Sequence, residues 1–236
     1  MQHCFLMSEP SSERTEPSSE RATVHRYAHR AAYDRATIDA ILDEGLVCHV
    51  GLQTDKGFPV VIPLAYGRQD DVVYLHGSAA SRLFRTARAD RVEICMTVTI
   101  VDGLVVARST YNTDINYRSV VLLGGATEVC DLDEKARGLE ALVEHVIPGR
   151  TADARVPTEK ELRATMLLRL PILEASAKVR TGWPEDNEED YGLPIWAGVV
   201  PMRTRYEGPL PDPQLRNPLA APSYTVTYAR PSVGSS

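Results

Sequence analysis

The segment best suited to bind an anion runs from His76 to Arg82 and reads HGSAASR. It follows a β-rich stretch and precedes one with helical spacing, so Gly77 would allow the tight turn between them. The first backbone amides of a helix have no partner within the helix, and with the helix dipole they favour a phosphate. Ser78, Ser81 and Arg82 could add hydroxyl and guanidinium donors. The alternative interpretation is a capped surface helix whose arginines are solvated.

A second candidate is Arg118, which together with Ser119 opens the apolar run at residues 116–130. A charged side chain that points inward from such a run needs a partner, because an unpaired buried charge is costly. The partner could be a carboxylate on another strand, or it could be a phosphate or a polar ring edge of a ligand. The sequence leaves both alternatives open.

A third candidate is the stretch Val61-Ile62-Pro63 in the β-rich run at residues 59–67. Proline cannot donate a backbone hydrogen bond, so this strand is expected at the edge of a sheet or bulged at Pro63. Such a strand can leave backbone groups free to contact a ligand. It can also be an ordinary edge strand with no ligand.

Trp183 and Trp196 are the two tryptophans of the chain, and each is expected in a strand beside an acidic or proline-rich loop. Aromatic side chains there could cover a flat ring or pack a subunit interface, and core packing is the commoner role. The histidines do not have the spacing of a metal site, and no P-loop, GxGxxG or GxSxG motif is present. No metal site is therefore expected.

The period of the apolar residues predicts the elements that position these candidates. Three β-rich runs joined by short turns predict an antiparallel meander, and the pair Gly124-Gly125 predicts a bulge or kink. Asp131, and Thr158 with Glu161 in capping-box spacing, predict two helix starts. Strands are expected over residues 46–53, 59–67, 72–77, 91–107, 116–130, 172–184 and 193–202, and helices over 37–45, 79–90, 131–147 and 158–170. The pattern indicates a mainly β fold with peripheral α-helices, a closed or half-closed barrel.

The composition is that of an ordinary globular chain, with 236 residues of which 43% are hydrophobic and 25% charged. The net charge of −6 argues against a general affinity for nucleic acid, which needs a basic surface. No apolar run has the length of a membrane helix and the N-terminus does not read as a signal peptide, so a cytoplasmic location without membrane contact is expected. Cys48, Cys95 and Cys130 lie in apolar runs and are expected to be buried thiols. The expected organisation is a disordered leader at 1–23, a folded domain at 24–207 and an extended, proline-rich tail at 208–236.

Three segments carry a resemblance to a known family: YLHGSAASR, YRSVVLLGGATEV and VRTGWPEDNEEDYGLPIWAG. In this order they resemble the pyridoxamine 5′-phosphate oxidase-related, FMN-binding split-barrel proteins, and most closely the branch with nitroimidazole-resistance-type flavoproteins. The similarity extends over residues 24–210. It implies a six-stranded antiparallel split β-barrel that forms a homodimer with FMN at the interface.

The resemblance also implies the roles of the candidate residues. Ser81 and Arg82, with the amides that follow His76, Gly77 and Ser78, would hold the FMN phosphate. Val61, Ile62 and Pro63 would lie along the isoalloxazine ring, and Arg118 and Ser119 would meet the ring or the phosphate edge. Trp196 of the partner subunit would approach the flavin.

The function implied is an FMN-dependent oxidoreductase that acts on a small molecule, with NAD(P)H as a transient donor. The C-terminal stretch VVPMRTRYEG departs from the family's substrate segment at Arg203 and Arg205, so oxidation of a vitamin B6 compound is not expected. No residue is identified as a catalytic acid or base. The alternatives are a flavin-binding protein without turnover, a deazaflavin enzyme, and a haem-binding split barrel with His76 or His145 as axial ligand.

Overall fold

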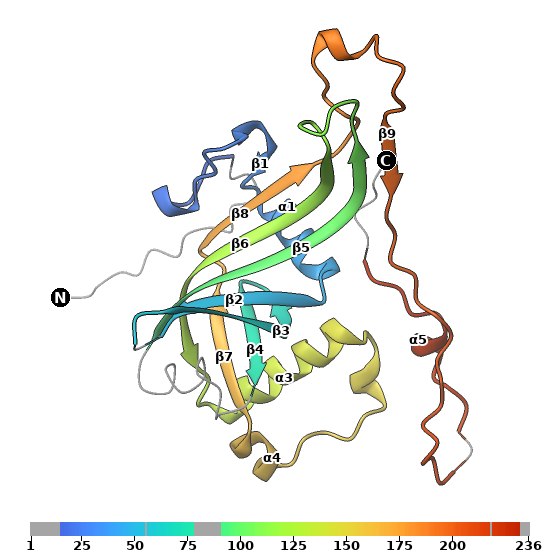
Figure 1. Ribbon diagram of the computed structural model, residues 1–236. Coiled ribbons are helices and arrows are strands. Elements are labelled where there is room, and N and C mark those ends of the chain that lie inside the picture. Colours follow the sequence, from blue (N-terminus) through green and yellow to red (C-terminus); the bar gives the residue numbers. More distant parts are fainter. Residues whose placement is uncertain (1–14, 55, 78–90, 218, 232–236) are drawn as a thin grey trace, which may run out of the picture.

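The chain forms a β-barrel that is closed by six antiparallel strands (Figure 1). The computed structural model describes residues 15–54, 56–77, 91–217 and 219–231. The strands of the barrel are β2 (Val47–Gln53), β3 (Pro59–Gln69), β4 (Val72–Gly77), β5 (Val92–Val106), β6 (Asp114–Glu128) and β7 (Met166–Pro171). They pair in the order β6-β7-β4-β3-β2-β5, and β5 pairs back to β6. The expected six-stranded barrel and its first meander are therefore confirmed.

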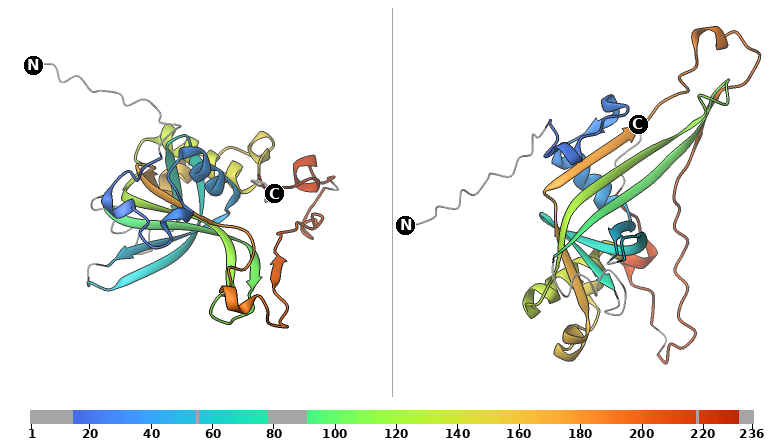
Figure 2. Two further views of the ribbon diagram at one scale, coloured as in Figure 1. Left: turned by 90° about the horizontal axis from the view of Figure 1, so that it is seen from above. Right: turned by 60° about the vertical axis from the view of Figure 1, so that its left-hand side comes forward.

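Three further strands extend the barrel at its open end. They are β1 (Ala31–Ala32), β8 (Glu174–Arg180) and β9 (Gly198–Pro201). β8 pairs with β6, β1 pairs with β8, and β9 pairs with the outer half of β5. The long β5–β6 hairpin projects past the barrel, and the loop at residues 181–197 covers its tip (Figures 1 and 2).

The helices lie around the barrel and end where local signals place them. They are α1 (Arg35–Glu44), α3 (Leu132–Val146), α4 (Glu159–Ala164) and α5 (Ser223–Val226), with single 3₁₀ turns η1 (Glu20–Ala22), η2 (Ala28–Arg30), η3 (Arg150–Ala152) and η4 (Glu188–Asp190). Asp131 caps α3, Thr158 and Glu161 form the expected capping box of α4, and Gly45 ends α1. The expected helix at residues 79–90 falls outside the described residues. No helix in the described part of the chain is long and apolar enough to cross a membrane.

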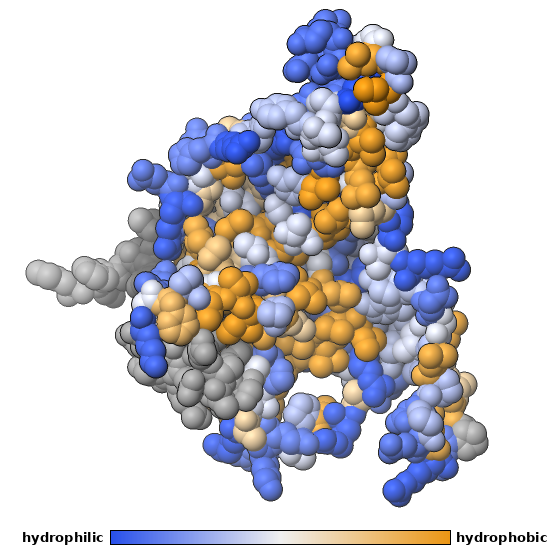
Figure 3. Space-filling view, viewed as in Figure 1, coloured by the Kyte–Doolittle hydropathy of each residue, from blue (hydrophilic) through white to orange (hydrophobic). Residues whose placement is uncertain are grey.

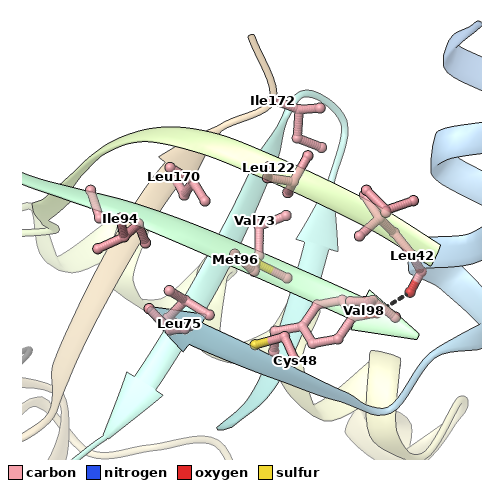
Figure 4. Packing of buried hydrophobic residues seen from close by; sticks show 14 of the residues in the cluster. Leu42, Cys48, Val73, Leu75, Ile94, Met96, Val98, Leu122, Leu170 and Ile172 are labelled. Atoms are coloured by element: carbon pink, nitrogen blue, oxygen red, sulfur yellow. Dashed lines mark hydrogen bonds between the residues drawn. The ribbon is translucent and has the colours of Figure 1, made fainter. Parts of the chain in front are cut away.

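The hydrophobic core fills the barrel (Figure 4). Alternate residues of each strand point inward, as Cys48, Val50 and Leu52 do on β2. The bottom of the core is joined to α1, because the buried Tyr66 hydroxyl donates to the carbonyl oxygens of Leu42 at 2.5 Å and Gly45 at 3.1 Å. Burial raises the pKa of Tyr66 well above its usual range, so this phenol stays neutral.

The expected helix at residues 158–170 is wrong in its second half. α4 ends at Ala164, and the run from Met166 onward is strand β7. Leu168 packs into the barrel while Leu167 packs on the other side with Tyr74. A strand buried on both faces shows no alternation of polar and apolar residues, so its sequence cannot be told from a helix by period.

The irregularity of the long hairpin lies at another glycine than expected. The β5–β6 register shifts between Val101 and Gly103. No shift occurs at Gly124 and Gly125, where a bulge or kink was expected. There β6 instead changes neighbour, from β8 up to Leu123 to β7 from Thr127 on.

The folded region also starts earlier than expected. Residues 18–23 were assigned to a disordered leader, but Ser19 and Arg21 donate to the Glu174 carboxylate at 2.7 and 2.6 Å, and Ala22 is buried. These contacts span more than 150 positions of sequence, so local composition does not reveal them. Cys48 is buried as expected, whereas Cys95 is half-buried and Cys130 is exposed.

Candidate cofactor-binding site

Among the described strands, the first half of β3 is paired on one side only, and we call its other side the free edge. β3 pairs with β4 only from Tyr66 to Gln69, whereas from Pro59 to Ala65 its one partner among the described strands is β2. Alternate residues of an antiparallel strand point their N–H and C=O groups to opposite sides, so no described strand pairs with the backbone groups that this half presents on the β4 side. The edge position expected from Pro63 is confirmed, and the register through Pro63 shows no bulge.

The outer face of this half-strand is apolar and exposed. Pro59, Val61, Pro63 and Ala65 face outward, and Val61 is 65% exposed. Ile62 faces the other way and packs against the core. Val61 and Pro63 can therefore contact a flat ring with their side chains, and Ile62 only with its backbone.

His76 and Gly77 lie where β4 leaves β3. Beyond Leu75, β4 pairs with β7 alone among the described strands, with His76 opposite Leu167. The His76 side chain is exposed and has no hydrogen-bond partner among the described residues. We call the place where the first half of β3 and the end of β4 part the split in the barrel. Val61, Ile62 and Pro63 lie on its β3 side, and His76 and Gly77 lie on its β4 side.

The remaining phosphate candidates follow directly in the sequence. Ser78, Ser81 and Arg82 lie outside the described residues, so their role in holding a phosphate stays a prediction.

Arg118 is paired with two carboxylates, which is the first of the two alternatives left open by the sequence. Its guanidinium donates to Asp102 at 2.7 and 2.8 Å and to Glu44 at 2.5 and 2.8 Å. These hydrogen bonds, to Asp102 first and then to Glu44, raise the pKa of Arg118. A ligand would have to displace a carboxylate to reach this side chain.

Ser119 is not brought to the split either. It pairs with Thr99 of β5 and Lys178 of β8, and its hydroxyl donates to the Lys178 carbonyl at 3.5 Å. Two strands, β5 and β2, separate it from β3. Neither Arg118 nor Ser119 thus lies with His76 in one copy of the chain.

Trp183 and Trp196 are 75% and 67% exposed and lie in the loop at 181–197, not in strands as expected. The loop is held by Asp186, whose buried carboxylate accepts the backbone N–H groups of Arg108 and Ser109 and the Arg108 guanidinium. Figure 1 shows this loop at the opposite end of the molecule from the end of β4. Neither tryptophan can therefore reach the split of its own barrel.

His145 is half-buried and makes its contacts within its own copy of the chain. Its Nε2 lies 2.7 Å from the Gly45 carbonyl oxygen, and its ring lies 4.5 Å from that of Tyr66. Burial, and then the nearby charge of Arg230, lower the pKa of His145 to about 4. The imidazole is therefore neutral and donates its Nε2 proton to Gly45.

His49 is a functional candidate that the sequence interpretation missed. It is exposed on β2, directly opposite Pro63 on the outer face of β3. Its alternation with the buried Cys48 and Val50 is a signal that could have placed it there. Among the described residues, no three His, Cys, Asp or Glu side chains are grouped as metal ligands.

Comparison with known proteins gives one family. Residues 34–179 match the family model described as pyridoxamine 5′-phosphate oxidase. No curated protein matches the chain. The flavocytochrome Anf3 from Azotobacter vinelandii is 45% identical, with a TM-score of 0.83 over 89% of this chain and 97% of that chain.

Two other solved structures are also similar. The FAD and haem binding protein from Mycobacterium smegmatis is 38% identical, with a TM-score of 0.78 over 83% of this chain and 95% of that chain. A putative 5-nitroimidazole antibiotic resistance protein from Bacteroides thetaiotaomicron shares the fold, with 21% identity and a TM-score of 0.53 over 63% of this chain and 86% of that chain. With its six-stranded barrel and the match over residues 34–179, the chain belongs to the pyridoxamine 5′-phosphate oxidase family.

Proposed function

We propose that this protein binds a flavin and a haem and works as a small redox protein that passes electrons between them. The observation that carries the proposal is the free apolar edge of β3 beside the exposed His76, in a chain 45% identical to a flavocytochrome. When bound, a flavin accepts hydride and a haem exchanges single electrons. The part of the protein is to bind, orient and shield these groups.

The split in the barrel fits a flavin. Val61 and Pro63 offer an apolar surface to the ring, and the unpaired backbone of β3 offers donors and acceptors to its polar edge. Ser81 and Arg82 would hold the phosphate nearest the ring, which FMN and FAD share. FMN alone would fill this part of the site, and FAD would extend beyond it.

His76 fits a haem ligand better than His145 does. An axial ligand needs a ring nitrogen that is free to reach the iron. His145 uses Nε2 on Gly45 and is buried under Arg230, so binding iron would break this packing. His76 is exposed at the end of β4, and we propose that it would hold the haem iron.

A second copy of the chain would complete the site. The outer sheet face exposes Val47, Val61, Val101, Leu104, Ile115 and Val200. Figure 3 shows this hydrophobic surface running from the β5–β6 hairpin down across β2. Contiguous apolar patches of this kind mark interaction surfaces. In the resulting homodimer, Trp196 of the partner subunit would approach the flavin.

We infer that the protein is an oxidoreductase on a small molecule, with NAD(P)H as the transient donor. No dinucleotide-binding GxGxxG motif is present to hold NAD(P)H permanently. Tyr66 is unsuited to proton transfer at the site, because its hydroxyl is buried on Leu42 and Gly45. Turnover with NAD(P)H and a small acceptor would separate an enzyme from a flavin carrier, which would hold the flavin without turnover.

Three histidine variants test the haem assignment, with absorption spectra of the purified proteins as the readout. His76→Ala should lose the Soret band and keep the flavin absorption. His49→Ala and the exposed control His25→Ala should keep both. An unchanged Soret band in His76→Ala would overturn the assignment of this ligand, and its loss in His49→Ala alone would move the ligand to β2.

A further inference from the structure

Residues 207–217 form a segment, here called the arm, that gains no burial in its own copy. Every residue of the arm is exposed, and Leu210 is 93% exposed. Its hydrogen bonds are local, from the N–H groups of Gln214 and Leu215 to Asp212. Figure 1 shows it as the loop below α5, beside the barrel and not on it.

The arm is not a free tail, because the chain is fixed on both sides of it. Before the arm, β9 pairs with β5, and the Met202 N–H donates to the Asp102 carbonyl at 2.9 Å. After the arm, the Tyr228 hydroxyl donates to the Val146 carbonyl at 2.7 Å. The rings of Tyr206 and Tyr228 meet with their centroids 4.6 Å apart and close the base of the loop.

Arg230 completes this attachment at the C-terminal side. Its guanidinium donates to the carbonyl oxygens of Glu44 at 3.2 Å and Gly45 at 3.0 Å, and also to those of Asp43 and His145. These carbonyls end α1 and α3, where a cation is favoured by the helix dipoles. The arm therefore leaves and returns at defined points.

The arm is also stiff. Pro209, Pro211 and Pro213 fix their own backbone angles, and the hydrogen bonds to Asp212 hold a turn at residues 212–215. A stiff segment loses little conformational entropy when it binds. An arm that presents Leu210 and Leu215 to water is thus prepared for a surface that its own copy does not supply.

We propose that the arm embraces a second copy of this chain, with Leu210 and Leu215 packed against the partner's barrel. In β9, Val200 pairs with Leu104, and Leu104 pairs with Ile115. These three exposed residues belong to the sheet face on which the proposed dimer forms, and residues 202–206 connect the end of β9 at Pro201 to the arm. In a two-fold dimer each arm would make the same contact with the other copy. This inference rests on the proposed dimer and extends its interface.

Limited trypsin digestion of the full-length protein tests the arm directly. Arg216 lies in the arm, and the exposed Arg155, outside it, is the control site. Sedimentation first gives the dimer dissociation constant. Above that concentration, cleavage after Arg216 should be at least about tenfold slower than below it, and cleavage after Arg155 should not change.

Matched leucine variants give a second test. Leu210→Asp/Leu215→Asp should raise the dimer dissociation constant at least about tenfold. Leu173→Asp is the control, because Leu173 is 70% exposed in the turn between β7 and β8. All three positions are exposed, so circular dichroism should show folded proteins.

The outcomes separate the arm from the dimer. If a wild-type dimer is cleaved equally fast after Arg216 at both concentrations, the proposed contact of the arm is wrong and the proposed dimer stands. The same holds if Leu210→Asp/Leu215→Asp weakens the dimer no more than Leu173→Asp does. A wild-type protein that is monomeric at every concentration overturns the proposed dimer and the arm with it.

Discussion

Arg118→Met separates a structural role of this arginine from a role in binding a ligand. Methionine keeps the apolar stem and removes the charge, which leaves Glu44 and Asp102 facing each other with side chains only 14% exposed. Removing one partner of a buried ion pair costs about 3–5 kcal/mol. Because these groups keep some contact with water, we expect the loss at the low end, about 3 kcal/mol in the free energy of unfolding.

Urea unfolding at pH 7, followed by circular dichroism, measures this loss. Arg163→Met is the control, because the Arg163–Glu159 pair has side chains 64% and 66% exposed, and surface pairs contribute less than about 1 kcal/mol. Adding Glu44→Gln and Asp102→Asn to Arg118→Met should restore part of the stability, since this removes the repulsion between the two carboxylates that Arg118 bridges.

The same variants decide the functional question. If the carboxylates hold Arg118, flavin affinity in Arg118→Met should be unchanged under conditions where the protein is folded. A stability loss below about 1 kcal/mol together with weaker flavin binding would show that Arg118 belongs to the cofactor site and is not held by the carboxylates.

Two further predictions concern the contacts around β3 and α3. As the pH falls from about 6.5 to about 4, wild-type stability should drop by up to about 1.4 kcal/mol per pH unit, because the unfolded chain takes up a proton that His145, with its pKa lowered to about 4, does not. Urea unfolding as a function of pH should show a smaller slope in His145→Gln, and an equal slope would contradict the assignment. Gly67→Ala should cost about 1–3 kcal/mol in thermal unfolding, since its Cβ would lie 2.4 Å from the Leu142 backbone nitrogen. Gly51→Ala is the control, because its Cβ would lie 3.6 Å from the nearest atom, the Cys95 carbonyl oxygen. Equal losses of stability in the two variants would contradict the close contact at Gly67.

The sequence predicted correctly the features that depend on neighbouring residues. Asp131 and the Thr158–Glu161 box begin helices and Gly45 ends one, as expected, because capping involves neighbours within three or four residues. The edge position of β3 followed from Pro63, which cannot donate to a ladder. The closed order of six strands came from the resemblance to a family.

Features that depend on distant contacts were beyond the sequence. The helix expected from residue 37 begins at Arg35, because the Asp34 carboxylate caps α1 by accepting the Thr37 N–H. Arg118 could have met a carboxylate or a ligand, and only the fold places Glu44 and Asp102 beside it. Chain positions 44 and 118 are brought together by tertiary packing alone.

The candidate site was predicted in part for the same reason. His76 and Val61 were identified from short patterns, and the fold places both at the split in the barrel. His145 contacts the ring of Tyr66 and the guanidinium of Arg230, which are both far away in sequence. Its helical position alone does not reveal that burial.

The most direct test of the account is the identity and amount of the chromophores released from the purified wild-type protein. Denaturation followed by chromatography should release a flavin and a haem in amounts equal to each other and to the protein chain. A colourless protein that takes up neither group when they are added, or a protein that holds flavin and never haem, would contradict the proposal that both groups bind beside the free edge of β3.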